Sequence, residues 1–91
     1  MADLFNSGRV CVTPNAQMLL GYPNPGIGEL LDRHLSGDWG DLDGEDKKAN
    51  KLALKEGLRL LSAYTLSSGT KIWIITEADR SVTTILLPEE Y

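Results

Sequence analysis

The sequence predicts a small α+β domain: a small antiparallel sheet, made of a C-terminal three-stranded meander plus an N-terminal strand, packed with two to three helices. Two observations support this prediction. Residues 60–87 hold three strand-like runs joined by short turns, and strands joined in this way pair antiparallel. Residues 14–60 hold helix-like segments whose apolar positions need a sheet to bury against. The 91 residues suffice for a single domain, 1–91, with a modest core.

The N-terminal quarter predicts a strand followed by a short helix. Residues 1–8 are expected to be a loose N-terminal lead-in. The run Arg9–Thr13 is rich in β-branched side chains and predicts a strand, which we expect at an edge of the sheet. Its last residue can cap a helix that has Pro14 at the first position, and Gly21 ends the short helix over residues 15–20.

The middle of the chain predicts two further helices. A rigid turn at Tyr22–Gly26 precedes the segment Ile27–Leu35, whose apolar residues share one helical face. A loop over residues 37–42 follows. Asp43 is a favourable N-cap for a helix from residue 44 to between 57 and 60. The stripe that we expect this helix to bury consists of Ala49, Leu52, Ala53, Glu56 and Leu60.

The last third predicts the three meander strands, at residues 60–66, 71–76 and 81–87. The middle strand is apolar on both faces, so we expect a central strand that is covered on both sides. The last strand also offers apolar side chains to both faces. A homodimer that assembles through the sheet is therefore one hypothesis.

Composition restricts the partners and the compartment. The formal charge is −4, and acidic residues gather at 38–46 and 89–90. Because phosphate contacts need clustered Lys and Arg, we expect no direct nucleic-acid binding, whereas a basic protein partner suits this charge. The chain has neither a long apolar run nor a basic, apolar leader, and its single cysteine is Cys11. These features predict a cytoplasmic protein without membrane contact or an intramolecular disulfide.

The chemistry-bearing side chains are few. The only histidine, His34, could form a metal site with Asp38 and Asp41, or act as a general base. One imidazole and a few loop carboxylates do not specify a metal geometry, so we expect no metal, no other cofactor and no catalytic set. The favoured interpretation is a histidine on the helix surface near the helix C-terminus. Cys11 is expected to be a small buried strand residue.

Two polar segments are the candidate binding regions, the loop at 37–42 and the turn at 77–81. Loops held by rigid strands are common positions for sites. Each segment also has a purely structural interpretation. Trp39 can fill the core while nearby aspartates cap the next helix, and Asp79 can close its own turn while Arg80 pairs with Glu77. The candidate binding residues are Asp38, Trp39, Asp41, Glu77, Asp79 and Arg80.

Two blocks of sequence resemble a known family. The first block is Gly37–Leu42 with Glu45, Asp46, Asn50 and Arg59–Tyr64, and the second is Lys71–Ser81 with Thr83–Pro88. They are similar to small bacterial proteins found on plasmids, integrated elements and phages, labelled plasmid-related or of unknown function and in some cases type I restriction enzyme subunit M. The resemblance covers about Val10 to Tyr91. It implies a single-domain protein of a mobile element and supplies no catalytic residues. A chain this short lacks the methyltransferase domain that a modification subunit needs.

Three functional hypotheses follow. The leading one is a non-enzymatic interaction protein of a mobile element, which acts on host defence or element maintenance through an acidic surface. The second is a small enzyme or ligand-binding domain with a site formed by the 34–41 and 77–81 segments. The third is a dimeric structural accessory protein.

Overall fold

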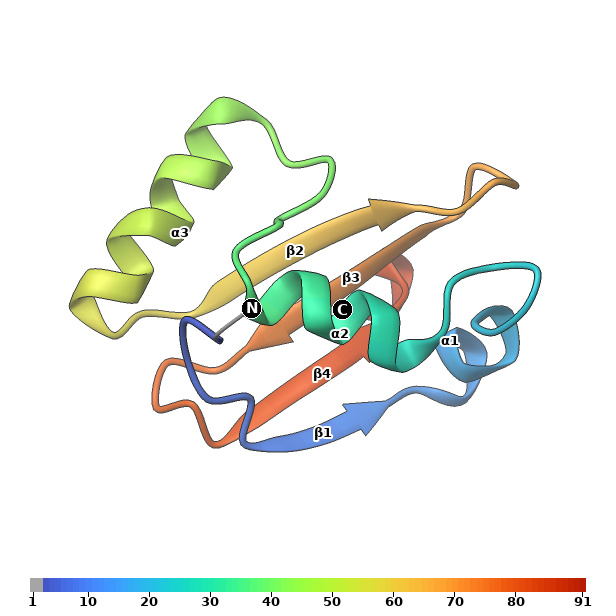
Figure 1. The fold of residues 1–91 in the computed structure, drawn as a ribbon, viewed down its shortest axis with the longest axis horizontal. Helices are drawn as coiled ribbons and strands as arrows, with labels where there is room; N and C mark the ends of the chain where they lie inside the picture. The colour runs from blue at the N-terminus through green and yellow to red at the C-terminus, as the bar shows by residue number, and fades with distance from the viewer. Residues whose placement is uncertain (1–2) are drawn as a thin grey trace.

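The computed structural model describes residues 3–91 and has the predicted α+β architecture (Figure 1). A four-stranded sheet has the strand order β1-β4-β3-β2, and helix α2 crosses its front face. The elements are β1 (Arg9–Val12), α1 (Pro14–Leu19), α2 (Ile27–Leu35), α3 (Gly44–Glu56), β2 (Leu60–Thr65), β3 (Lys71–Thr76), β4 (Val82–Leu86) and the 3-10 helix η1 (Pro88–Glu90).

The C-terminal strands form the predicted meander, whereas β1 departs from the expected antiparallel sheet. Strands β2, β3 and β4 pair antiparallel in sequence order. Strand β1 joins the free side of β4 at an edge, as expected, but runs parallel to it, with Arg9 opposite Val82. The sheet is therefore mixed. A parallel pair is feasible here because the three helices between β1 and β2 supply the long crossover that parallel strands require.

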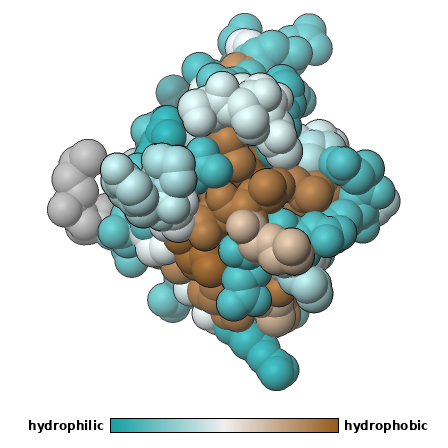
Figure 2. Space-filling view, turned by 90° about the vertical axis from the view of Figure 1, so that its right-hand side faces the viewer, coloured by the Kyte–Doolittle hydropathy of each residue, from teal (hydrophilic) through white to brown (hydrophobic). Residues whose placement is uncertain are grey.

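The main core lies between the front face of the sheet and helices α1 and α2. Alternate strand residues, among them Tyr64, Ile74 and Ile85, point to this face. Helix α2 contributes Leu30, which is completely buried, and α1 contributes Ala16. At the end of the sheet near α1, this apolar cluster reaches the surface between polar side chains (Figure 2). The partly buried residues packed against the core are Val12, Leu19, Leu20 and Ile27.

Helix α3 begins as predicted but buries a different face. Asp43 caps it, because the Asp46 N–H donates to the Asp43 Oδ1 at 2.8 Å. Gly57 ends it in the left-handed conformation. Of the expected stripe, Ala53 is buried on the helix and Leu60 is buried as the first residue of β2, while Ala49, Leu52 and Glu56 are exposed. The expected stripe was wrong because α3 packs beside the edge of β2 (Figure 1), so a narrower face containing Asn50 and Ala53 is covered.

The free edge of β2 is closed by hydrogen bonds. The Asn50 side chain acts like a neighbouring strand, donating to the Leu61 carbonyl at 2.6 Å and accepting from the Leu61 N–H at 3.1 Å. Two residues further along β2, the Ala63 N–H donates to the Trp39 carbonyl, and the Asp41 N–H donates to the Ala63 carbonyl. These contacts satisfy polar groups that an exposed edge would offer to another chain.

The rear face of the sheet is covered differently from the front. No helix longer than a single turn lies on it among the described elements, and η1 brings Tyr91 against Trp73 with ring centroids 6.0 Å apart. The Arg59 guanidinium lies over the Tyr91 ring, 5.4 Å from its centroid. The apolar central strand is thus covered by α2 in front and, in part, by the chain's own C-terminus behind.

The expected loose lead-in is held to the fold within its described part, since residues 1 and 2 lie outside the description. The Leu4 N–H donates to the Leu35 carbonyl at 2.8 Å. Phe5 packs edge-on against His34, with ring centroids 5.2 Å apart. The Ser7 carbonyl accepts a hydrogen bond from the Thr83 hydroxyl at 2.7 Å. The sequence prediction missed these contacts because each partner is distant along the chain.

Two glycines with similar backbone angles allow a test of the β2 edge. Gly40 has φ +74°, and a Cβ there would lie 2.0 Å from the Ala63 carbonyl oxygen. Gly57 has φ +70° but no neighbour within 4 Å of such a Cβ. We expect Gly57→Ala to lower the free energy of unfolding by about 1 kcal/mol through backbone strain alone. We expect Gly40→Ala to lower it by about 3 kcal/mol, because the bridge must also separate.

Urea unfolding of both variants measures the difference. Equal losses for the two variants would show that the Gly40 bridge contributes nothing beyond its backbone angle.

Candidate functional site

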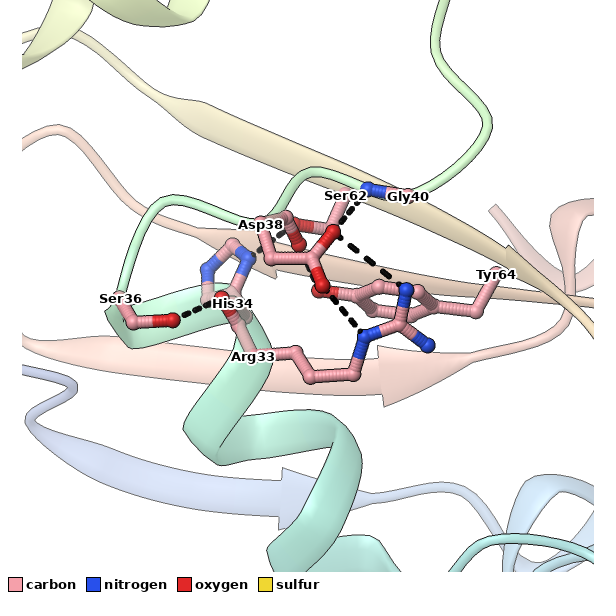
Figure 3. Close-up of polar contacts among 7 residues, drawn as sticks. All are labelled: Arg33, His34, Ser36, Asp38, Gly40, Ser62 and Tyr64. Atoms are coloured by element: carbon pink, nitrogen blue, oxygen red, sulfur yellow. Dashed lines mark hydrogen bonds and ion pairs between the residues drawn. The ribbon is translucent and has the colours of Figure 1, made fainter. Parts of the chain in front are cut away.

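The C-terminal end of α2 carries a polar cluster that spans three elements (Figure 3). The Arg33 Nε donates to the Asp38 Oδ2 at 2.7 Å, and the guanidinium lies 4.5 Å from the centre of the Tyr64 ring. The Tyr64 hydroxyl in turn donates to the Asp38 carbonyl at 2.6 Å, and the Gly40 N–H donates to the Asp38 Oδ1 at 3.2 Å. This cluster attaches the loop after α2 to strand β2.

The charges within this cluster balance one another. The hydrogen bond from Arg33 holds the pKa of Asp38 below its usual value, and the same bond raises the pKa of Arg33. Both side chains are about half exposed, at 42% and 50%, so solvent screening keeps the stabilisation by this ion pair small. Its main consequence is geometric: the positive charge of Arg33 is directed toward Asp38.

A surface hollow of about 310 Å³ lies beside this pair, lined by Asp3, Asp32, Arg33 and Ser36. Since Asp38 holds the Arg33 guanidinium, the carboxylates of Asp3 and Asp32 dominate the charge of the hollow. Neither residue was among the predicted site residues. Asp32 could have been found as an exposed acid next to Arg33 on α2. Asp3 could not, because only the folded N-terminal segment brings it to the helix.

The predicted residues of the 37–42 loop have separate partners. Asp38 binds Arg33, as described. Trp39 is half-buried and stacks on Phe5, with ring centroids 6.3 Å apart. The carboxylate of Asp41 accepts a hydrogen bond from the Thr65 hydroxyl at 2.6 Å. These three side chains therefore hold the loop against different parts of the fold.

The predicted residues of the 77–81 turn are also engaged locally. Asp79 closes its own turn, as the structural interpretation expected, by accepting from the Ser81 N–H at 3.0 Å. The Ser81 hydroxyl also donates to this carboxylate, and this bond, together with the one from the N–H, holds the pKa of Asp79 below its usual value. Glu77 is exposed, and its N–H donates to the Val82 carbonyl.

Arg80 caps the end of α3 instead of pairing with the Glu77 carboxylate. Its guanidinium donates to the Ala53 carbonyl at 3.0 Å and to the Leu58 carbonyl at 2.6 Å, and it also reaches two carbonyls of its own turn. Positive charge is favoured at a helix C-terminus. The guanidinium also lies 5.7 Å from the centre of the Phe5 ring. The 37–42 and 77–81 segments thus both contact Phe5, through Trp39 and Arg80.

His34 is in the core, which corrects the expected surface position. Its side chain is completely buried, between the front of the sheet and the aromatic rings of Phe5 and Trp39. The Nδ1 atom lies 2.5 Å from the Ser62 hydroxyl, and the Nε2 atom lies 2.9 Å from the Thr76 hydroxyl. Within residues 3–91 no carboxylate is hydrogen-bonded to the ring, so the interpretation of a metal ligand or oriented base with Asp38 and Asp41 is not supported by the geometry.

The donor and acceptor of each hydrogen bond in this buried network follow from its last bond, between Thr83 and the Ser7 carbonyl. A carbonyl can only accept, so the Thr83 hydroxyl donates to the Ser7 carbonyl and must accept from Thr76. Thr76 has then used its proton and accepts from the N–H at Nε2 of His34. The neutral ring therefore accepts at Nδ1 from Ser62. Thr76 and Thr83 thus each donate one hydrogen bond and accept one, and Ser62 donates to the ring.

The His34–Ser62 pair resembles a nucleophile with its base, but it is not placed to react with a substrate. Ser62 and His34 are both completely buried. A nucleophile must reach the substrate, and a general base must meet the proton that it removes.

Cys11, expected to be buried, is exposed on β1 instead.

Comparison of the chain with protein-family models, curated proteins and solved structures finds no match in any of the three. Over residues 3–91, no group of three or more His, Cys, Asp or Glu side chains is placed to hold a metal ion. In the same residues, no helix is long and apolar enough to cross a membrane.

The buried histidine makes stability depend on pH. Burial lowers the pKa of His34 from 6.5 to about 4, so between these values the unfolded chain binds a proton that the folded chain does not. Stability is therefore complete above pH 6.5 and falls as the pH drops toward 4, by about 3 kcal/mol in total. Urea unfolding at several pH values measures this loss.

The matched control is His34→Gln, which keeps a donor and an acceptor but does not titrate. It should be less stable at pH 7 and should lose most of the pH dependence between 6.5 and 4.5. A wild-type stability that stays constant over this range would contradict the neutral buried ring.

Arg80 offers a test of its structural role. Arg80→Lys keeps the charge, but an ammonium group cannot reach the Ala53 and Leu58 carbonyls in the geometry of the guanidinium fork. We expect the free energy of unfolding to fall by about 2 kcal/mol. Arg59→Lys, which changes an exposed arginine beside Tyr91, should cost less than half as much. Thermal and urea unfolding compare the two, and equal losses would refute the capping role of Arg80.

Proposed function

We propose that this chain is a non-enzymatic interaction protein that binds a basic segment of a protein partner at the acidic hollow beside α2. The observation that carries the proposal is the pairing of Arg33 with Asp38, which leaves the Asp3 and Asp32 carboxylates as the exposed charges of the hollow. A Lys or Arg side chain of a partner would meet both carboxylates there. Complementary charge of this kind sets specificity and speeds encounter.

Two further features support a binding role. The net charge of −4 attracts a basic partner at longer range. The sequence blocks that resemble proteins of plasmids and phages suggest a mobile element as the setting, with host defence or element maintenance as the process affected. The basic partner would then be a protein of the host or of the element.

The alternative of a small enzyme with its site at the 34–41 and 77–81 segments has less support. His34 is buried with both ring nitrogens occupied, and Arg80 is engaged by main-chain carbonyls. The side chains that this alternative needs to meet a substrate are thus committed to the fold.

Binding of a fluorescent Lys- and Arg-rich peptide tests the hollow. We expect the wild-type protein to bind it and the double variant Asp3→Asn, Asp32→Asn to bind roughly tenfold or more weakly, since two partly solvated charge pairs are lost. Fluorescence anisotropy at low and physiological salt measures both affinities, and the wild-type affinity should fall with added salt.

The control for net charge is the double variant Glu89→Gln, Glu45→Gln, which removes two exposed carboxylates at other places. If this variant loses as much affinity as the Asp3, Asp32 variant, the peptide responds to net charge and the hollow is not the site.

A further inference from the structure

The two edges of the sheet differ, since one is covered and the other is open. The β2 edge is closed by Asn50 and by the loop segment around Gly40, and α3 lies beside it. The β1 edge has no described element beyond it, as Figure 1 shows. Natural sheets blunt their free edges, so an edge that is left open is a candidate for pairing with another chain.

The hydrogen bonds of β1 show which groups are available. The Arg9 N–H donates to the Ser81 carbonyl at 2.9 Å, and the Thr13 N–H donates to the Ile85 carbonyl at 3.0 Å. Backbone groups alternate in direction along a strand, so residues 9, 11 and 13 face β4. The N–H and C=O groups of Val10 and Val12 therefore face away from the sheet.

The side chains of β1 leave this edge accessible. Arg9, Val10 and Cys11 are exposed, and Val12 is half-buried. Val10 shows 38% of its surface to solvent although its side chain is apolar and β-branched. The strand contains no proline or bulge, which are features that prevent strands from pairing at an edge, and its one charged residue is Arg9 at its first position.

We propose that a second copy of this chain pairs antiparallel along β1, around a two-fold axis at Cys11. This register sets Val10 of each copy opposite Val12 of the other, so all the outward-facing groups of both residues are used. A register centred on Val12 would oppose Val10 to Pro14, which has no N–H and begins α1. A register centred on Val10 would require Gly8, at φ +61°, to pair as an extended residue.

Charge complementarity supports a second copy as the occupant. In the Cys11-centred register, Arg9 of one copy lies opposite Thr13 of the other, on the rear face of the sheet. The Thr13 hydroxyl donates to the Glu90 carboxylate at 2.8 Å. Side chains directly opposite on paired strands have Cβ atoms about 5 Å apart. Arg9 can therefore reach Glu90 of the other copy, and the pair occurs twice.

The size of the contact predicts a weak dimer. Residues 9–13 of each copy, five in all, form the paired strands, which is less surface than stable protein interfaces usually bury. We expect reversible association at high micromolar concentrations. This inference uses a surface separate from the acidic hollow, so either can fail without the other.

Cys11 provides a reporter of the register. It would face Cys11 of the second copy in a non-hydrogen-bonded pair, in which the Cα atoms are about 4.5 Å apart. This distance lies within the range of roughly 4.4–6.8 Å that disulfides bridge. Diamide, an azo oxidant, would take two electrons and two protons from the two thiols as the sulfur–sulfur bond forms, and would itself become the hydrazine.

The experiment combines sedimentation equilibrium with the rate of diamide cross-linking. We expect a monomer–dimer equilibrium and a cross-linked dimer that forms faster than in either edge variant. Val10→Pro removes an outward N–H, so it should abolish the dimer and slow cross-linking at least fivefold. Its control is Val10→Ala, which keeps the N–H. Arg9→Glu is an exposed change that introduces no proline into the strand. It should weaken the dimer because it places a Glu side chain near Glu90 of the other copy.

Two further controls complete the test. Lys71→Glu reverses an exposed charge on β3, and this variant should dimerise as strongly as the wild type. Cys11→Ser should lose the cross-link but keep the sedimentation equilibrium. A monomer at all concentrations, or a cross-linking rate that is the same in wild type, Val10→Pro and Arg9→Glu, would overturn the proposal.

Discussion

The buried hydrogen-bond chain through His34 connects most of the fold. It links Ser62 on β2 and Thr76 on β3 to helix α2, and it continues through Thr83 on β4 to the Ser7 carbonyl of the N-terminal segment. The apolar layer around it determines how closely α2 can approach the sheet, but a polar group left without a partner in that layer would be costly. The chain of single donors and acceptors therefore specifies one position for α2 relative to all three meander strands. The end of α2, the Arg33–Asp38 pair and the hollow beside it are placed by this constraint.

The residues that look functional in the sequence have structural roles. A histidine, several aspartates and an arginine would be the usual candidates for chemistry in a small acidic protein. Here the imidazole is buried in the core, Asp79 closes a turn, and Arg80 donates to the carbonyls at the end of α3. What remains for recognition is charge at the surface and backbone at one sheet edge. The hollow lined by Asp3 and Asp32 and the open edge of β1 are formed by residues that have no strong individual signal.

The fold was largely predictable because local signals agreed with it. β-Branched runs and short turns determine the meander, the apolar spacing of Ile27–Leu35 determines α2, and Asp43 with Gly57 bounds α3. The parallel direction of β1 was not predictable from these signals. Its own sequence is equally compatible with either direction, and the crossover of three helices permits the parallel pairing with β4 that the structure shows. The exposed stripe of α3 also depends on a contact distant along the chain. Asn50 binds the edge of β2, so the face of α3 that contains Asn50 is covered and its more apolar face is left exposed.

The amino-acid sequence by itself therefore determined the class of fold, the order of its elements and the residues that cap them, because these depend on neighbours along the chain. Tertiary structure decided the surroundings of the acidic hollow and of the histidine. It brought Asp3 next to Asp32, since the Leu4 N–H bonds to the end of α2, and it buried His34, since Ser62 and Thr76 meet the ring from distant strands. It also closed one edge of the sheet and left the other open. Each of these outcomes depends on contacts between residues far apart in sequence, where periodicity and spacing carry no information.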